Sequence, residues 1–354
     1  MQRIIENTSK YKDGSSEVGM KYSTSQGSKM KKIKILLGIA MVVSVLTIPV
    51  HGAEGDTAIP VISEIPQITP VETPVRELHV EGNKIFYYYK GKMVRNKWKR
   101  YEGYKYYFGE DGYACIGGSK IGNKAYVFDE NGHLLENQKG KMRTVLNKKY
   151  CIASDNGQPK TGYFIYHNDL YYADSKGRCY QNRTREDGQL YFTSSGKARK
   201  DTNALLKMRV MNLVSRLTTS EMSKNQKLHV CWEYIVDDAG FQYGGSDPDL
   251  KKAGWCRKTA LSMLNTKVGN CYGFASTLAA FAKELGYKKI ELIDGRTPGT
   301  RDHAPDGFTG HCWVRIDNRY YDPEADWAGW MTGVYGYNSY PIRHYVKKIY
   351  NFMR

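Results

Sequence analysis

The sequence lacks several patterns that would assign it to a common class of protein. We find no nucleic-acid-binding motif, and the seven cysteines form neither a tight disulfide framework nor the spacing of a zinc site. The apolar run at residues 35–50 is shorter than the roughly 20 residues that a membrane-spanning helix needs. Only one tryptophan, Trp98, lies between residues 79 and 199. These absences argue against nucleic-acid binding, against a metal centre and against a membrane span.

A strong positive charge is what the sequence does have. Its 354 residues, enough for two domains, carry 53 lysines and arginines against 36 acidic residues, a net charge of +17. Such an excess predicts an anionic partner, which could be a nucleic acid, an acidic membrane or an acidic polymer. We favour a polymer outside the cell, because the N-terminal region carries an export signal.

The N-terminal region reads as a sequence of targeting and spacer segments. Residues 30–53 have a basic start, an apolar centre and a small residue at the end, which is typical of a secretory signal peptide. An uncleaved membrane anchor is the alternative. Residues 1–29 are either a disordered tail or a mis-called start, with Met30 as the true first residue. Residues 54–78 are rich in proline and predict an extended linker.

Residues 79–199 repeat with a period near 20 residues. Each unit has an aromatic or apolar cluster soon after its start, and most units then carry a turn such as Asp111-Gly112 or Asn131-Gly132. This pattern predicts a chain of β-hairpins. Because one hairpin cannot bury its aromatic face alone, we expect the units to stack as an all-β solenoid. The units begin near Gly82, Gly103, Gly122, Asn147, Asn168 and Gly188.

The period and the Tyr-Tyr-Phe…Asp-Gly pattern resemble the cell-wall-binding repeats, of choline-binding or glucan-binding type, of Gram-positive surface proteins. The resemblance implies attachment to a bacterial cell-wall polymer, either a glycan or a teichoic acid. Choline-binding versions surround a quaternary ammonium with an aromatic cage, usually of tryptophans. Since Trp98 is the only tryptophan here, we expect a glycan or another wall polymer rather than choline.

A cysteine stands at the start of an expected helix in the C-terminal part. The stretch 269–275 reads as a turn leading into a helix, and the apolar residues Phe274, Leu278 and Phe281 continue along one helical face. Gly286 is a natural stop. The positive end of a helix stabilises a thiolate, so Cys271 is a candidate nucleophile, although a buried core cysteine is the commoner fate.

A histidine and an aspartate lie on the strands predicted downstream. Asp317-Asn318 reads as a two-residue hairpin turn, which pairs Ile316 with Arg319. In that register His311 and Asp322 are diagonal neighbours on one face of the sheet, within reach of a side-chain contact. Cys271, His311 and Asp322 therefore form a candidate set of nucleophile, base and orienting group.

The order Cys, His, Asp resembles the transglutaminase-like superfamily of papain-like cysteine enzymes. The matching features are Gly-x-Cys before an amphipathic helix, His-x-Trp on a strand, and Tyr-Asp-Pro after it. The resemblance covers residues 200–354 and implies an α+β catalytic domain without a cofactor. It implies a cysteine acyltransferase or amidohydrolase that forms a thioester from a glutamine or peptide amide of a protein or peptide substrate, with cross-linking and hydrolysis both open. The alternative is a non-catalytic surface adhesin on an inactive scaffold.

The remaining expectations for this domain are structural. We expect helices over residues 200–240, with a capping box from Thr218 to Glu221 and a buried face containing Leu228 and Trp232. Cys312 follows His311 on the strand, so its side chain should point to the opposite face and into the core. Tyr243 and Trp255 are candidates to lie near the site, without an assigned role. A metal site of Cys256, His303, His311 and Cys312 matches no zinc pattern and is not predicted.

Overall fold

The computed structural model describes residues 75–185, 189–331 and 333–353. The predicted tail, signal peptide and all but the last residues of the linker lie outside this part of the chain. Within it, the helices are too short or too polar to cross a membrane.

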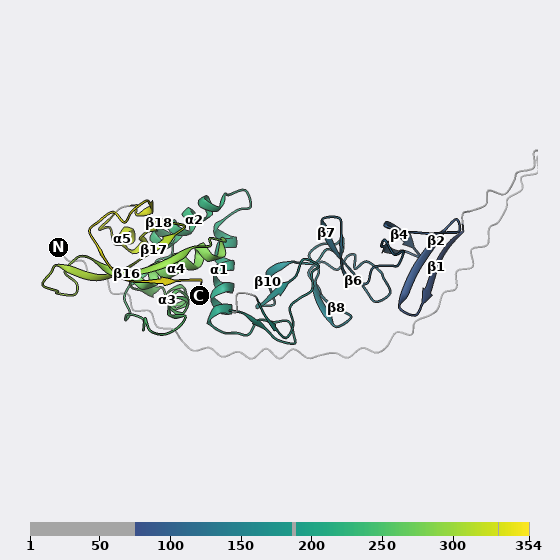
Figure 1. Ribbon diagram of the computed structural model, residues 1–354, viewed down its shortest axis with the longest axis horizontal. Helices are drawn as coiled ribbons and strands as arrows, with labels where there is room; N and C mark the ends of the chain where they lie inside the picture. Colours follow the sequence, from purple (N-terminus) through teal and green to yellow (C-terminus); the bar gives the residue numbers. More distant parts are fainter. Residues whose placement is uncertain (1–74, 186–188, 332, 354) are drawn as a thin grey trace, which may run out of the picture. The chain divides into compact units, whose positions relative to one another are not determined.

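The repeat region consists of small antiparallel hairpins, as the turn signals predict (Figure 1). Strands β1, β2 and β3 form a three-stranded sheet, and each later pair forms a sheet of its own. The strands are β1 (Arg76–Glu81), β2 (Lys84–Tyr89), β3 (Lys92–Met93), β4 (Lys97–Tyr101), β5 (Tyr104–Phe108), β6 (Gly117–Ile121), β7 (Lys124–Phe128), β8 (Met142–Val145), β9 (Lys148–Cys151), β10 (Gly162–Tyr166), β11 (Asp169–Ala173), β12 (Arg183–Thr184) and β13 (Tyr191–Phe192).

The hairpin turns lie where the repeats were expected to begin, for example at Gly82 and Gly103. The Asp-Gly and Asn-Gly turns come after the second strand instead, and the chain beyond each of them forms an isolated bridge such as Phe108 with Ala114. Backbone hydrogen bonds then join each of these segments to the hairpin before it. The pairs are Ala114 N–H to Ile85 O, Leu134 N–H to Lys105 O, Val127 N–H to Gly157 O, Cys179 N–H to Lys149 O, and Ala198 N–H to Leu170 O.

The C-terminal part begins with helices, as expected. They are α1 (Thr202–Leu217), α2 (Lys224–Glu233), the π-helical turn η1 (Tyr234–Asp238) and α3 (Trp255–Thr266). The buried face of Leu228 and Trp232 is confirmed. The capping box is not where it was predicted: Ser223 and Gln226 form it at the start of α2, because the chain between α1 and α2 does not become helical until residue 224.

A five-stranded antiparallel sheet faces helix α4 (Cys271–Glu284), with strand order β19-β18-β17-β16-β20. Its members are β16 (Ile290–Pro298), β17 (Phe308–Ile316), β18 (Arg319–Tyr321), β19 (Tyr335–Tyr337) and β20 (Tyr345–Asn351). Residues of α4, β16 and β17 share one hydrophobic core. The helix was expected to bury one face, but every residue from Cys271 to Ala282 is buried. Helix α4 is therefore central to the domain.

The β17–β18 hairpin follows the predicted register, with Ile316 opposite Arg319. Asp317 and Asn318 both have positive φ angles, which a tight turn of this kind requires. The prediction that Asp322 continues the strand is wrong. The strand ends at Tyr321, and Asp322 is the N-cap of the short helix α5 (Pro323–Trp327), because a side-chain oxygen of aspartate can accept the backbone N–H groups at a helix start.

Candidate active site

Cys271 is the first residue of α4, where two short parallel strands place it. Strand β14 (Gln242–Tyr243) pairs with β15 (Val268–Gly269), which ends two residues before the cysteine. Gly269 packs closely here, because a Cβ atom would lie 2.8 Å from the sulfur of Met263 and would displace that side chain. The N-cap residue Asn270 turns its side chain away from the helix, and its amide donates to Asp247 Oδ1 at 2.7 Å. The positive end of the helix is thus not capped by that side chain.

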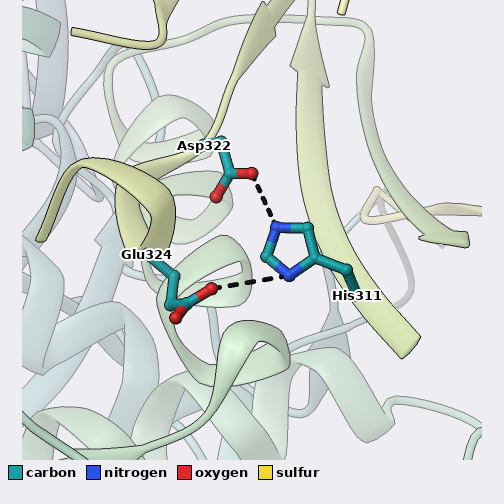
Figure 2. A group of neighbouring side chains, drawn as sticks. All are labelled: His311, Asp322 and Glu324. Carbon is teal, nitrogen blue, oxygen red and sulfur yellow. Dashed lines mark hydrogen bonds and ion pairs between the residues drawn. The ribbon is translucent and has the colours of Figure 1, made fainter. Parts of the chain in front are cut away.

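His311 and Asp322 meet in the buried space beside this helix (Figure 2). The Nε2 atom of His311 lies 2.6 Å from Asp322 Oδ2, and the two side chains are 3% and 0% exposed. Asp322 Oδ1 accepts the Ala325 N–H at 3.1 Å, and Tyr340 donates its hydroxyl hydrogen to Asp322 Oδ2. These contacts hold the carboxylate rigidly, so it fixes the orientation of the imidazole ring.

Cys271 also lies close enough to His311 to act on its charge. Since Asp322 holds Nε2, the ring nitrogen left for other partners is Nδ1. Burial opposes the charged imidazole, but the charge and hydrogen bond of Asp322 and the contact with Cys271 raise the pKa of His311 well above its usual value. This arrangement favours the charged imidazole. The structure thus brings together all three residues of the predicted set.

A second carboxyl group, that of Glu324, lies against the same imidazole (Figure 2). Its Oε2 atom is 3.4 Å from Nδ1 of His311, and the residue is 7% exposed. Glu324 and Asp322 stand two positions apart at the start of α5 and approach opposite nitrogens of the ring. The sequence signal for Glu324 was its position directly after Asp322-Pro323, at the first turn of a helix that was not expected.

A cleft of about 460 Å³ opens beside His311. Tyr243 lines it and is 40% exposed, and Arg301 donates one hydrogen bond to the Tyr243 hydroxyl oxygen and another to the Gly310 carbonyl. Burial, together with the nearby charge of Cys271, raises the pKa of Tyr243. A neutral hydroxyl group therefore stands near Cys271. Trp255, the other candidate, packs in the core and against Tyr272.

The second cysteine of this region, Cys312, lies in the hydrophobic core and is 1% exposed, as the strand pattern predicts. Burial raises the pKa of its thiol well above the usual value, so it stays protonated.

Within the described residues, one group of possible metal ligands has its ligand atoms within 4.8 Å of one another: His311, Asp322 and Glu324. The metal site considered from the sequence, with Cys256 and His303, is not formed there. The two carboxylates face opposite ring nitrogens of His311, so a single ion cannot take both of those contacts. Asp322 already accepts three hydrogen bonds. This donor set suits proton sharing better than a metal ion.

Comparison with known proteins identifies the domain. Residues 211–331 match the family described as the transglutaminase-like superfamily, which confirms the resemblance and shows that the C-terminal part is a transglutaminase-like domain. A search of curated proteins gives no match.

Similar solved structures correspond to the repeat region. They include an alternansucrase bound to isomaltononaose, with 22% identity over 35% of this chain and a TM-score of 0.22. Choline binding protein F from Streptococcus pneumoniae matches with 22% identity over 36% of this chain and a TM-score of 0.18. A third is the modular autolysin LytC from Streptococcus pneumoniae with a synthetic peptidoglycan ligand, which matches with 21% identity over 35% of this chain and a TM-score of 0.23. The matched parts span only 10%, 48% and 28% of those chains.

Proposed function

We propose that the transglutaminase-like domain is a cysteine acyltransferase or amidohydrolase that acts on glutamine or peptide amides. Cys271 is the nucleophile, His311 the acid and base, and Asp322 the group that orients the imidazole. The observation that carries this proposal is the buried His311, which is hydrogen-bonded to Asp322 through Nε2 and lies close to Cys271 at the start of α4. Such a pair activates a thiol near neutral pH.

The reaction begins when the Cys271 thiolate attacks the amide carbonyl carbon and a tetrahedral oxyanion forms. The backbone N–H of Cys271 at the helix start can donate to that oxyanion, and the Tyr243 hydroxyl is the second donor that we propose. Because Arg301 donates to the Tyr243 oxygen, the phenolic hydrogen is left to point elsewhere, toward the cleft. His311 then protonates the leaving nitrogen, and a thioester remains on Cys271.

The thioester goes either to water, which gives hydrolysis, or to an amine, which gives a cross-link. His311 serves both outcomes by removing a proton from the incoming group. The exposed cleft beside His311 admits either nucleophile, so both belong to the proposal.

We further propose that the chain is secreted and cell-wall associated, with residues 79–199 as the wall-binding module and residues 200–354 as the catalytic module. Support comes from the hairpin repeats and from charge, since residues 75–200 hold 24 lysines and arginines against 13 acidic residues. The hydrogen bonds between successive hairpins support stacking into a solenoid. The ligand is a glycan or teichoic acid of the wall, reached partly through electrostatic attraction.

The surroundings of Trp98 support a wall ligand other than choline. Its ring packs edge-on against Tyr107 and Tyr126, with centroids 5.1 Å away in each case. The ammonium group of Lys105 lies 4.7 Å from the Trp98 ring. A cation of the chain itself thus occupies the aromatic face that a quaternary ammonium would need.

Thiol reactivity tests the catalytic proposal against the non-catalytic scaffold. Iodoacetamide at neutral pH, followed by peptide mapping, should modify Cys271 faster than the other six cysteines, and prior modification should abolish amide turnover. Equal, slow modification of all seven cysteines together with no amide turnover would favour an adhesin.

A further inference from the structure

Glu324 is a buried carboxyl group for which the three-residue mechanism has no use. It lies 3.4 Å from Nδ1 of His311, and it lines the cleft beside that ring. Trp330 lines the same cleft. A carboxyl group in this place either carries a proton or adds a charge to the reaction centre.

Charge balance favours the proton. An ionised Glu324 would face two like charges, on the Cys271 thiolate and on Asp322, in a site largely closed to water, whereas a neutral thioester removes one of them. Burial, more than any other cause, raises the pKa of Glu324, and His311 opposes that shift. The charged and titratable groups that face Glu324 are His311 on β17, Asp322 at the start of α5, Arg301 between β16 and β17, Tyr243 on β14, and Tyr340 before β20.

We propose that Glu324 is the second proton carrier of the active site, protonated while Cys271 is a thiolate and ionised while Cys271 is acylated. The inference rests on the proposed function, since it concerns the same reaction. It adds a fourth residue to the catalytic machinery and gives it a role that neither His311 nor Asp322 can fill.

The protons of acylation show why a second carrier is needed. When the thiolate attacks a glutamine amide, the C–S bond forms, the C–N bond breaks, and the leaving nitrogen ends as ammonium near neutral pH. The amide nitrogen must gain two protons for this. The imidazolium of His311 supplies one and the carboxyl group of Glu324 supplies the other. Neutral imidazole, an ionised Glu324 and the thioester remain, and the total charge is unchanged.

Deacylation returns both protons. When water attacks the thioester, the C–S bond breaks, the product leaves as a carboxylate, and the water molecule has given up two protons. His311 accepts one and Glu324 the other, while the thiolate re-forms. An incoming ammonium group that becomes an amide likewise loses two protons to the same pair. Hydrolysis and transfer therefore make the same demand on Glu324.

The test compares substrates that need one proton or two. A short peptide containing glutamine releases ammonia, whereas the same peptide with a glutamate γ-methyl ester releases neutral methanol and needs only one proton. Glu324→Gln should lower kcat/KM on the glutamine peptide by about 10²-fold, the scale of general acid catalysis. Its kcat/KM on the ester, which reports the acylation step, and its rate of iodoacetamide labelling should stay near those of the unchanged protein. A merely structural role would reduce all three rates together, and that result would overturn the proposal.

Infrared spectroscopy on the unchanged protein gives a second readout. Alkylation of Cys271 by iodoacetamide removes the thiolate charge, so Glu324 should lose its proton. The difference spectrum should show loss of the carbonyl band of a protonated carboxyl group. Glu324→Gln should lack this change, and Glu291→Gln, whose partner is Arg315 at 2.7 Å, should keep it. The same band change in Glu324→Gln refutes the assignment.

The two failures are distinguishable. Full amide turnover in Cys271→Ala would refute the proposed function itself. An inactive Cys271→Ala, combined with an unchanged ratio of amide to ester kcat/KM in Glu324→Gln, would refute only the second proton carrier.

Discussion

Cys271 and Cys312 provide a matched pair of mutations in which only the chemistry should differ. Both are 1% exposed and belong to the same hydrophobic core. Removal of either sulfur leaves a void of roughly 25 Å³, which costs about 0.6 kcal/mol at about 24 cal/mol per Å³. Lost burial of the sulfur adds about 0.8 kcal/mol. Each alanine variant should therefore lose about 1.4 kcal/mol, or roughly 3–6 °C in Tm for a domain of this size.

Activity should separate the two variants completely. Cys271→Ala should lose amide turnover and iodoacetamide labelling at this position, because no other group can form the thioester. Cys312→Ala should keep both, since its thiol stays protonated in the core. Calorimetry, steady-state kinetics and peptide mapping measure the three quantities. Retained turnover in Cys271→Ala together with its loss in Cys312→Ala would refute the nucleophile assignment.

Three further outcomes test the site and one tests the repeats. Asp322→Asn should lower kcat by up to about 10⁴-fold at an unchanged fold, since the imidazole loses its orienting charge; retained activity would contradict this. Tyr243→Phe should lower kcat by about 10²-fold with little change in KM, as expected for a lost oxyanion donor; a change in KM alone would point to substrate binding. Because the pKa of His311 is raised in the folded state, its protonation stabilises the fold fully below about pH 6.5, and this stabilisation is lost as pH rises through the folded-state pKa. Over that pH range, the Tm of the unchanged protein should fall toward the Tm of His311→Gln. A fragment of residues 79–199 should sediment with Gram-positive cell walls and be partly released by salt, not by choline. If the C-terminal part sediments with walls and this fragment does not, the repeats are not the wall-binding module.

The sequence was informative where local signals decide the structure. Helix α4 could be predicted because its apolar residues repeat at helical spacing and Gly286 follows its end with positive φ. The β17–β18 hairpin could be predicted because Asp317-Asn318 suits the turn. These elements bring Cys271 and His311 to neighbouring parts of one core, so two of the three candidate residues were placed by local rules.

The same local rules could not predict the long-range contacts of the site. Tyr340 donates to Asp322 from 18 residues further along the chain, and Arg301 holds Tyr243 across 58 residues. Neither pair leaves a spacing that a periodicity can reveal. Asp322 itself was expected on a strand, but the aspartate-proline pair after Tyr321 starts a helix, since proline suits the first helical position and aspartate the cap. The error left His311 and Asp322 in contact, because both arrangements bring residue 322 beside β17.

The two carboxyl groups of α5 show how different roles can arise within one helical turn. Asp322 accepts hydrogen bonds from His311, Tyr340 and the Ala325 N–H, which suits a group that fixes the imidazole. Glu324, two residues later, lies 3.4 Å from Nδ1 of the same ring, and burial raises the pKa of its carboxyl group. The proposed orienting group and the proposed proton carrier thus flank one imidazole. In this proposal, the number of hydrogen-bond donors around each carboxyl group separates the two roles.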